Sequence, residues 1–285
     1  MPLADWQAVL LSMPALALFG LCVGSFLNVV IHRLPQQVER DLKEQASDIL
    51  GLPAPDLGPP LTLSHPPSRC PSCGHRIRWY ENIPVVSWLA LRGRCSSCKT
   101  GISARYPAIE ILCGVLFAAM GWLHGPHPVT LAWCGFAALL LAAALIDWDT
   151  TYLPDVLTGP LLWGGLVAAT LGWTIPLPDA VWGAVGGFMS LWTVAAAWKL
   201  VRGEIGMADG DFILLAGLGA WLGWQMLLPL VLAASAIGAI VGIGMWLSGA
   251  LREGRYVPFG PFLAGAGLAV LFAGRERVFG WMGWA

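Results

Sequence analysis

The sequence predicts an all-α, polytopic membrane protein with about eight transmembrane helices and one small polar domain between the first and second. Of the 285 residues, 57% are hydrophobic and only 12% are charged, whereas soluble proteins carry about 25% charged residues. Long apolar segments recur along the chain, and the one sizeable polar segment covers residues 33–104. A formal net charge of −1 gives no basic field that would attract nucleic acid.

The first apolar segment, about Val9–Ile31, exceeds the roughly 20 residues that a membrane-spanning helix needs. No basic stretch precedes it, so we expect a retained helix and not a cleaved signal peptide. The further expected spans lie, in chain order, near 106–123, 129–147, 156–173, 180–200, 211–226, 228–248 and 259–273. This order predicts three parts: a first transmembrane helix (1–32), a polar loop (33–104) and a transmembrane core (105–285).

The distribution of basic residues predicts the orientation. Lys and Arg gather in residues 33–105, whereas the loops expected on the opposite side contain neither, near 124–128, 174–179 and 227–229. The positive-inside rule therefore predicts that the polar loop is cytosolic and that the N-terminus lies outside.

Two cysteine pairs within the polar loop predict a metal centre. Cys70 and Cys73 form the first pair, Cys95 and Cys98 the second, and residues 74–94 separate them. Two such pairs are typical of a tetrahedral zinc site. Four thiolates leave no open position on the ion, so we expect structural zinc. Two disulfides, or a redox or other metal centre, are the alternatives, and a reducing cytosol argues against disulfides.

Carboxylates at the edges of two apolar runs predict a catalytic site. Asp147 ends one run and Asp211 begins another; counting spans places both at the cytosolic membrane face. A charge at mid-bilayer costs roughly 2.5–3.5 kcal/mol, so such residues indicate function. A pair that shares one proton can activate water, which predicts an intramembrane aspartic peptidase. Spacing alone does not choose between Asp147 and Asp149, or between Asp209 and Asp211.

Several motifs occur in a characteristic order, and together they cover nearly the whole chain outside residues 36–60. They are Gly24–Pro35, the two cysteine pairs, Asp147 with Leu153-Pro154-Asp155, Gly206–Asp211 followed by Leu214-Leu215-Ala216, and Val257–Pro261. This combination resembles the type IV prepilin peptidase family, the Gly-x-Gly-Asp intramembrane aspartic peptidases.

The resemblance implies that Asp147 and Asp211 are the catalytic pair. It further implies a multi-pass enzyme of the bacterial inner membrane, with a periplasmic N-terminus and a cytosolic zinc loop. Such an enzyme cleaves the leader peptides of type IV prepilins or type II secretion pseudopilins. It then methylates the new N-terminus with S-adenosyl-L-methionine.

The methyl-donor site is not apparent from sequence, and no glycine-rich nucleotide loop is present. Because the family's methyl transfer depends on the cysteine loop, Arg92, Gly93 and Arg94 beside Cys95 are the candidate region. Contact of these arginines with anionic lipid headgroups is the alternative.

Candidates for a substrate groove are Gly210, Pro258, Phe259 and Gly260. Pro258 is equally consistent with the start of a helix.

Two positions depart from the family pattern: Ala208 replaces the first glycine of Gly-x-Gly-Asp, and Ile213 replaces a common lysine. The alternatives to a bifunctional enzyme are a peptidase without methyl transfer, a transporter that uses the acids as a proton relay, and an inactive secretion scaffold.

Overall fold

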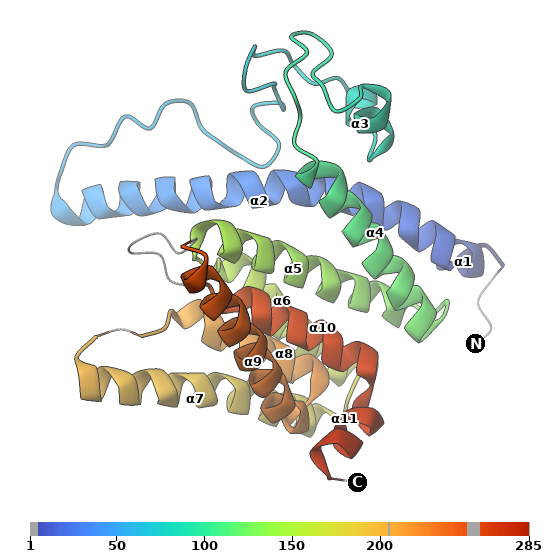
Figure 1. The fold of residues 1–285 in the computed structure, drawn as a ribbon, viewed down its shortest axis with the longest axis vertical. Coiled ribbons are helices and arrows are strands. Elements are labelled where there is room, and N and C mark those ends of the chain that lie inside the picture. Colours follow the sequence, from blue (N-terminus) through green and yellow to red (C-terminus); the bar gives the residue numbers. More distant parts are fainter. Residues whose placement is uncertain (1–4, 205, 250–256, 285) are drawn as a thin grey trace. The chain divides into compact units, whose positions relative to one another are not determined.

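The computed structural model describes residues 5–204, 206–249 and 257–284 (Figure 1). Over these residues the regular secondary structure is helical, and no strand forms beyond two isolated bridges, Arg69 with Arg76 and Arg94 with Gly101. This confirms the predicted all-α class. The chain divides into two compact units, Met1–Cys134 and Gly135–Ala285.

Unit 1 is built on two long helices that pack closely. It contains α1 (Asp5–Leu10), α2 (Met13–Leu50), the 3₁₀ turn η1 (Trp79–Asn82), α3 (Val86–Ala90) and α4 (Arg105–His124). A Cβ atom at Gly20 would lie 2.8 Å from the carbonyl oxygen of Cys113, and one at Gly24 would lie 2.7 Å from Cα of Glu110. Glycine at these positions therefore allows the backbones of α2 and α4 to approach each other.

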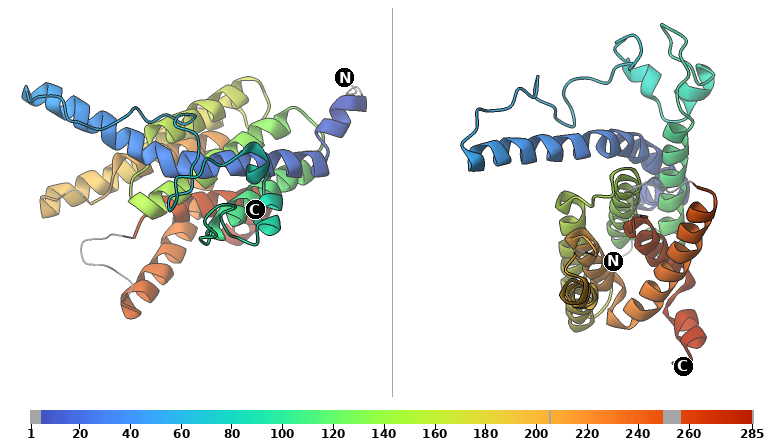
Figure 2. Two further views of the ribbon diagram at one scale, coloured as in Figure 1. Left: turned by 90° about the horizontal axis from the view of Figure 1, so that it is seen from above. Right: turned by 60° about the vertical axis from the view of Figure 1, so that its left-hand side comes forward.

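Helix α2 is longer than its apolar segment. It continues through Pro35 for 38 residues, and the chain then returns along it as an extended segment (Figure 2). Arg33 fixes this return by donating to the carbonyl oxygens of Thr62 at 2.9 Å and Pro66 at 2.7 Å, and Arg40 donates to that of Pro59 at 2.7 Å. Side chains of one helix thus position the segment that leads to the cysteines.

Unit 2 surrounds one central helix. Its elements are α5 (Val129–Thr150), whose first turns belong to unit 1, α6 (Asp155–Thr170), α7 (Leu177–Arg202), α8 (Asp209–Leu222), η2 (Trp224–Met226), α9 (Leu227–Leu247), α10 (Gly260–Ala273) and α11 (Arg275–Met282). Helix α8 packs against α6, α7 and α10, and Leu214–Leu222 are all buried.

The contacts of α8 are close. A Cβ atom at Gly183 of α7 would overlap the carbonyl group of Gly219, and Trp221 donates its indole N–H to the carbonyl oxygen of Leu161 at 2.8 Å. Such contacts fix α8 against two neighbouring helices, which gives the residues at its ends a defined position.

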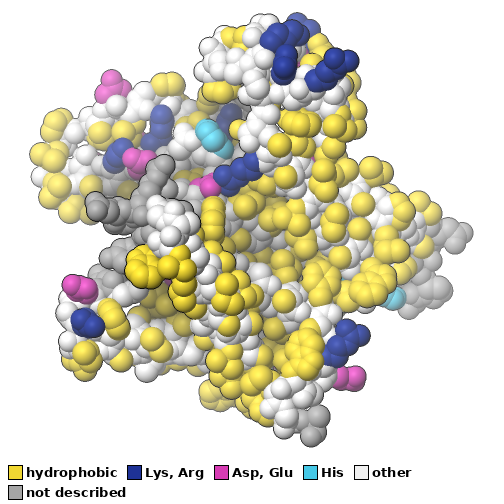
Figure 3. All heavy atoms as spheres, in the orientation of Figure 1, with side chains coloured by type: hydrophobic (Ala, Val, Ile, Leu, Met, Phe, Trp, Pro, Cys, Tyr) yellow, Lys and Arg dark blue, Asp and Glu magenta, His cyan; other side chains and the backbone are white. Residues whose placement is uncertain are grey.

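In the part of the chain that the structure describes, five helices are long and apolar enough to cross a membrane: α2, α4, α5, α7 and the continuous segment Trp224–Leu247. Helices also cover the other three expected spans, but α6, α8 and α10 have only 16, 14 and 14 residues. Hydrophobic side chains cover much of the visible helix surface in Figure 3, whereas Lys and Arg appear in small groups, some of them on the polar part at the top of the view. This polytopic arrangement agrees with the prediction.

Candidate functional site: two buried aspartates and a four-cysteine centre

Among the described residues of unit 2, the buried acidic ones are Asp147 and Asp211. Asp147 lies in the last turn of α5 and is 4% exposed; Asp211 lies in the first turn of α8 and is 8% exposed. Leu153 packs both against Gly210, the residue before Asp211, and against Gly260, which contacts Asp147. Two acids that are remote in sequence therefore occupy one buried site.

The carboxylate of Asp147 is held by the start of α10. Its Oδ2 atom accepts the backbone N–H of Gly260, the first residue of that helix, at 2.9 Å. The first N–H groups of a helix lack partners within the helix and favour a negative charge. The close approach requires glycine, because a Cβ atom at position 260 would lie 2.6 Å from Oδ2 of Asp147.

Leu153 connects this contact to the start of α8. After α5 the chain turns sharply at Thr151, whose φ of 55° is left-handed, and Leu153 is buried. A Cβ atom at Gly260 would lie 3.0 Å from Cδ1 of Leu153, and one at Gly210 would lie 2.6 Å from its Cβ. Leu153 thus packs against two glycines, one that donates to Asp147 and one that precedes Asp211.

Asp211 carries an unused hydrogen-bond acceptor. Within the described part of the chain, its buried Oδ1 atom has no hydrogen-bond partner. Leaving a buried polar atom unsatisfied costs about 1–3 kcal/mol. The site therefore has one carboxylate fixed by the protein and one with an oxygen free for water or substrate.

The neighbouring acids have different surroundings. Asp209 is the first residue of α8 and is exposed, and Asp155 is the first residue of α6 and is also exposed. Asp149 is partly buried and interacts with other groups. The sequence left Asp149 and Asp209 as alternatives, and neither is buried to the extent of Asp147 and Asp211.

The four cysteines of unit 1 form a compact cluster. The sulfur atoms of Cys70, Cys73, Cys95 and Cys98 all lie within 4.8 Å of one another, and those of Cys70 and Cys98 are 3.8 Å apart. Four sulfurs at a Zn–S distance of about 2.3 Å in a tetrahedron are about 3.8 Å apart. The cluster can therefore hold a metal ion of this size with little rearrangement.

The two cysteine turns have the same backbone pattern. In the first, Cys70 N–H donates to the carbonyl of His75 at 2.9 Å and Gly74 N–H donates to that of Cys70 at 2.9 Å. In the second, Cys95 N–H donates to the carbonyl of Thr100 at 2.8 Å, and Lys99 N–H donates to that of Cys95 at 3.1 Å. Each turn thus presents its two sulfurs through local hydrogen bonds.

The chain is similar to known proteins over most of its length. Residues 18–124 match the bacterial peptidase A24 N-terminal domain, and residues 134–243 match the type IV leader peptidase family. A protein of Stutzerimonas stutzeri named "Prepilin leader peptidase/N-methyltransferase" is 49% identical over 262 residues, which cover 90% of this chain and 89% of the relative. The chain belongs to the type IV leader peptidase family.

Other members of this family with the same name are similarly close. The relative from Pseudomonas aeruginosa is 47% identical over 283 residues, covering 97% of this chain and 96% of its own, and that from Neisseria gonorrhoeae is 44% identical over 274 residues, covering 96% and 94%. No solved structure matched the chain. The resemblance stated from the sequence motifs is therefore confirmed.

The departure from the family motif at Ala208 has a simple conformational outcome. Ala208 precedes α8 with φ −82° and ψ 150°, an extended conformation that alanine adopts freely. The methyl group at this position therefore imposes no backbone strain. Ile213, the second departure, is partly buried on α8.

The other sequence candidates lie close to these sites. Pro258 and Phe259 are partly buried and lead into Gly260, with Phe259 at the N-cap of α10. Gly93 is buried against Trp88, while Arg92 and Arg94 on either side are exposed.

Two contacts were not found from sequence: the hydrogen bond from Gly260 to Asp147 and the packing of Leu153. Both lie in motifs that the resemblance used, Leu153-Pro154-Asp155 and Val257–Pro261. Those motifs could have suggested a link between the start of α10 and the end of α5, but nothing in their spacing implied a contact.

Proposed function

We propose that this family member is an aspartic endopeptidase that cleaves the leader peptides of type IV prepilins or type II secretion pseudopilins. We also propose that it methylates the N-terminus that cleavage exposes. The observation that carries the peptidase activity is the buried pair: Asp147 held by the Gly260 N–H, and Asp211 with a free carboxyl oxygen.

In the proposed mechanism, Asp147 is the ionised member because the start of α10 stabilises its negative charge. Asp147 takes a proton from a water molecule, and the oxygen of that water attacks the scissile carbonyl carbon. Asp211 holds the shared proton, donates a hydrogen bond to the carbonyl oxygen and then protonates the leaving amine. The reaction needs no covalent intermediate.

Isosteric substitutions test the assignment. Asp147→Asn and Asp211→Asn should each lower cleavage of a model prepilin in detergent by about 10²–10⁴-fold, the usual contribution of a positioned acid or base. Asp209→Asn is the matched control, because Asp209 lies in the same helical turn as Asp211 but is exposed. Wild-type turnover in either of the first two variants would reject the mechanism.

We propose that the four cysteines bind Zn²⁺ and that the ion is structural. All four positions of a tetrahedral ion would be filled by thiolates, which leaves none for substrate. The ion would join the two cysteine turns, which are otherwise separate loops. Elemental analysis of the purified protein should find about one zinc per chain, and no metal would contradict the proposal.

We propose that the enzyme lies in the bacterial inner membrane with the cysteine loop in the cytosol and the N-terminus in the periplasm. The support is the concentration of Lys and Arg in residues 33–105. A tag at the N-terminus should be accessible to a membrane-impermeant label in intact spheroplasts, and a tag in the cysteine loop should not.

Both proposed activities can be read in one measurement. Mass spectrometry of a prepilin co-expressed with the enzyme gives the cleavage position and shows whether the new N-terminus carries a methyl group. Cleavage without methylation would support the proposed peptidase activity and contradict the proposed methyltransferase activity. A transporter or an inactive scaffold would give neither product.

A further inference from the structure

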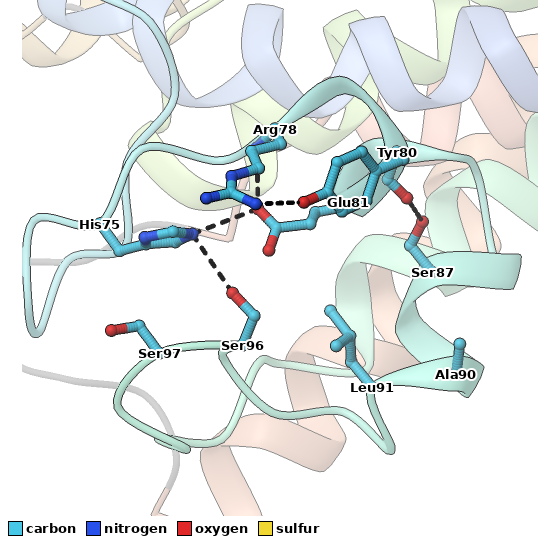
Figure 4. A pocket seen from close by; sticks show the side chains of 9 residues that line it. All are labelled: His75, Arg78, Tyr80, Glu81, Ser87, Ala90, Leu91, Ser96 and Ser97. Carbon is cyan, nitrogen blue, oxygen red and sulfur yellow. Dashed lines mark hydrogen bonds and ion pairs between the residues drawn. The ribbon is translucent and has the colours of Figure 1, made fainter.

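Unit 1 contains a cavity of about 530 Å³ beside the cysteine cluster (Figure 4). Its walls come from three parts of the loop: the segment after the first cysteine pair, η1 with α3, and the turn between Cys95 and Cys98. Ligand pockets commonly have volumes of about 300–1,000 Å³. The cavity is thus large enough for a small organic ligand such as a nucleoside joined to an amino acid.

A carboxylate is fixed on one side of the cavity. Oε2 of Glu81 accepts the backbone N–H of Arg78 at 2.8 Å and lies 3.2 Å from Nε2 of His75. The hydroxyl of Ser96 lies 3.2 Å from the same nitrogen. The Arg78 N–H, followed by the Ser96 hydroxyl, lowers the pKa of Glu81 to about 2. This side chain, only 10% exposed, therefore presents a negative charge at neutral pH.

A cation and an apolar surface complete the lining. The guanidinium of Arg78 donates to the hydroxyl of Tyr80 and lies 5.8 Å from the centre of its ring. Ala90 and Leu91, at the end of α3, form the opposite wall in Figure 4. One cavity thus offers a fixed anion, an oriented guanidinium, hydroxyl groups and an apolar face.

We propose that this cavity is the site where the methyl donor S-adenosyl-L-methionine binds, an assignment that rests on the proposed methyltransferase function. The ligand carries a cationic sulfonium and amino group, a carboxylate, a ribose with two hydroxyls, and a flat adenine. Glu81 complements the positive charges, Arg78 the carboxylate, and the wall at Ala90 and Leu91 the adenine.

When bound, the donor supplies a methyl carbon: the amine lone pair forms the C–N bond, the C–S bond breaks with its electron pair kept by sulfur, and the amine releases one proton to water. The terminal amino group of a cleaved substrate, with an ordinary pKa of about 7.7–8.0, has a neutral fraction available at neutral pH. The chain therefore has to supply binding and orientation, which the fixed groups of the cavity provide.

The position of the cavity links it to the metal centre. Ser96 and Ser97 lie between two cysteines of one pair, and His75 follows the other pair by two residues. A metal ion that joins the two turns would therefore set the distance between two walls of the cavity. This gives a structural reason for a cysteine cluster in a domain that binds a methyl donor.

Equilibrium dialysis of the purified full-length protein with radiolabelled S-adenosyl-L-methionine tests the site. Ala90→Trp fills the cavity from an exposed position and should weaken binding at least tenfold. Leu89→Trp is the matched control: Leu89 is the preceding residue of α3, is 61% exposed and does not line the cavity. Zinc content and leader cleavage should stay at wild-type values in both.

Removing the negative charge is the second test. Glu81→Gln should also weaken binding at least tenfold, whereas Glu44→Gln, on an exposed face of α2, should not. If Glu81→Gln loses zinc because η1 is disturbed, the binding measured for Ala90→Trp tests the proposed site by itself.

The outcomes separate the site from the function. If Ala90→Trp and zinc-replete Glu81→Gln bind the methyl donor and transfer its methyl group as the wild type does, the proposed binding site is wrong. The proposed methyltransferase function is then unaffected. Binding that depends on Ala90 and Glu81, without any transfer of label to a cleaved substrate, supports the site and rejects the transferase. A wild-type protein that neither binds nor transfers overturns both.

Discussion

The four cysteines of unit 1 come from two short turns, each formed by its own backbone hydrogen bonds, whereas the two aspartates of unit 2 come from helices that meet only through packing. In the cysteine cluster, local geometry presents the sulfurs and a metal ion would join the turns. In the aspartate site, a backbone N–H spans 113 positions of sequence to fix a carboxylate. The cysteine cluster would depend on a bound metal ion, whereas the aspartate site depends on the absence of side chains at Gly210 and Gly260.

This difference has an energetic consequence. A structural zinc ion contributes about 10–16 kcal/mol to the folding of a small domain, because the site does not exist in the unfolded chain. A close helix contact contributes far less, but displacement of a reacting group by about 1 Å can cost 10²-fold in rate. Loss of the metal ion should therefore unfold the cysteine loop. A change in helix packing at the aspartate site should instead lower the activity of a protein that stays folded.

The largest effect is expected on removal of the metal. A strong chelator with a denaturant low enough to preserve the helices should release zinc, unfold residues around the cysteine turns and abolish methyl-donor binding. Hydrogen exchange of the turns, followed by mass spectrometry, checks this. Protection that is unchanged after zinc loss would show that the turns are stable without the ion. Cys22→Ser, in α2 and outside the cluster, is the control for thiol loss.

The next largest effect is expected at Gly260. Gly260→Ala places a methyl group 2.6 Å from Oδ2 of Asp147, so the carboxylate or α10 must shift, and cleavage should fall about 10²-fold. Zinc content should not change. Gly265→Ala, in the same helix with open space around it, is the control. Equal rates in the two variants would mean that the contact at Gly260 does not position Asp147 for the reaction.

A smaller effect is expected where α7 crosses α8. Gly183→Ala would overlap the carbonyl group of Gly219, and overpacking of this kind costs about 1–3 kcal/mol. The thermal midpoint in detergent should fall, with leader cleavage lowered only as α8 moves. Gly135→Ala, which meets nothing within 4 Å, should keep the wild-type midpoint. A normal midpoint for Gly183→Ala would indicate that the two helices separate easily.

The smallest effect is expected at Lys99. This residue adopts φ 61° in the second cysteine turn, where the first turn has Gly74 at φ 70°. A left-handed conformation costs a residue with a side chain about 1–2 kcal/mol, so Lys99→Gly should retain zinc against a competing chelator slightly better than wild type. The reverse change, Gly74→Lys, should retain it less well. Opposite results would show that the hydrogen bond from Lys99 to the carbonyl oxygen of Ser96 matters more than backbone strain.

Much of the arrangement could be predicted because it depends on local pattern. The length of the apolar segments predicted a helix over each expected span. The cysteine spacing predicted a cluster of four sulfurs, because a cysteine pair separated by two residues already forms half of a metal site. Motif order predicted the family. Apolar length underestimated α2, because residues 36–50 are polar helix formers that continue the helix after hydrophobicity ends.

The remaining features depend on contacts between distant segments. No property of Gly260 by itself shows that its N–H meets Asp147, and nothing in Leu153 shows that it lies between Gly210 and Gly260. The candidate region for the methyl donor, Arg92–Arg94, stays a prediction, and the cavity in the structure is lined by neighbouring residues. Such contacts follow from the way helices pack, which single-sequence patterns do not encode.

The length of α8 determines how deep a substrate must enter. Its 14 residues extend about 21 Å, whereas the hydrocarbon core of a bilayer is about 30 Å thick. With its C-terminal end at one boundary of the core, the first residue of α8 lies about 9 Å inside the other boundary, and Asp211, two residues further along, lies about 12 Å inside it, which is about two turns of a substrate helix. A peptide cut at this depth needs a polar leader that stays in water and an apolar stem that stays in lipid, with only the junction unwound.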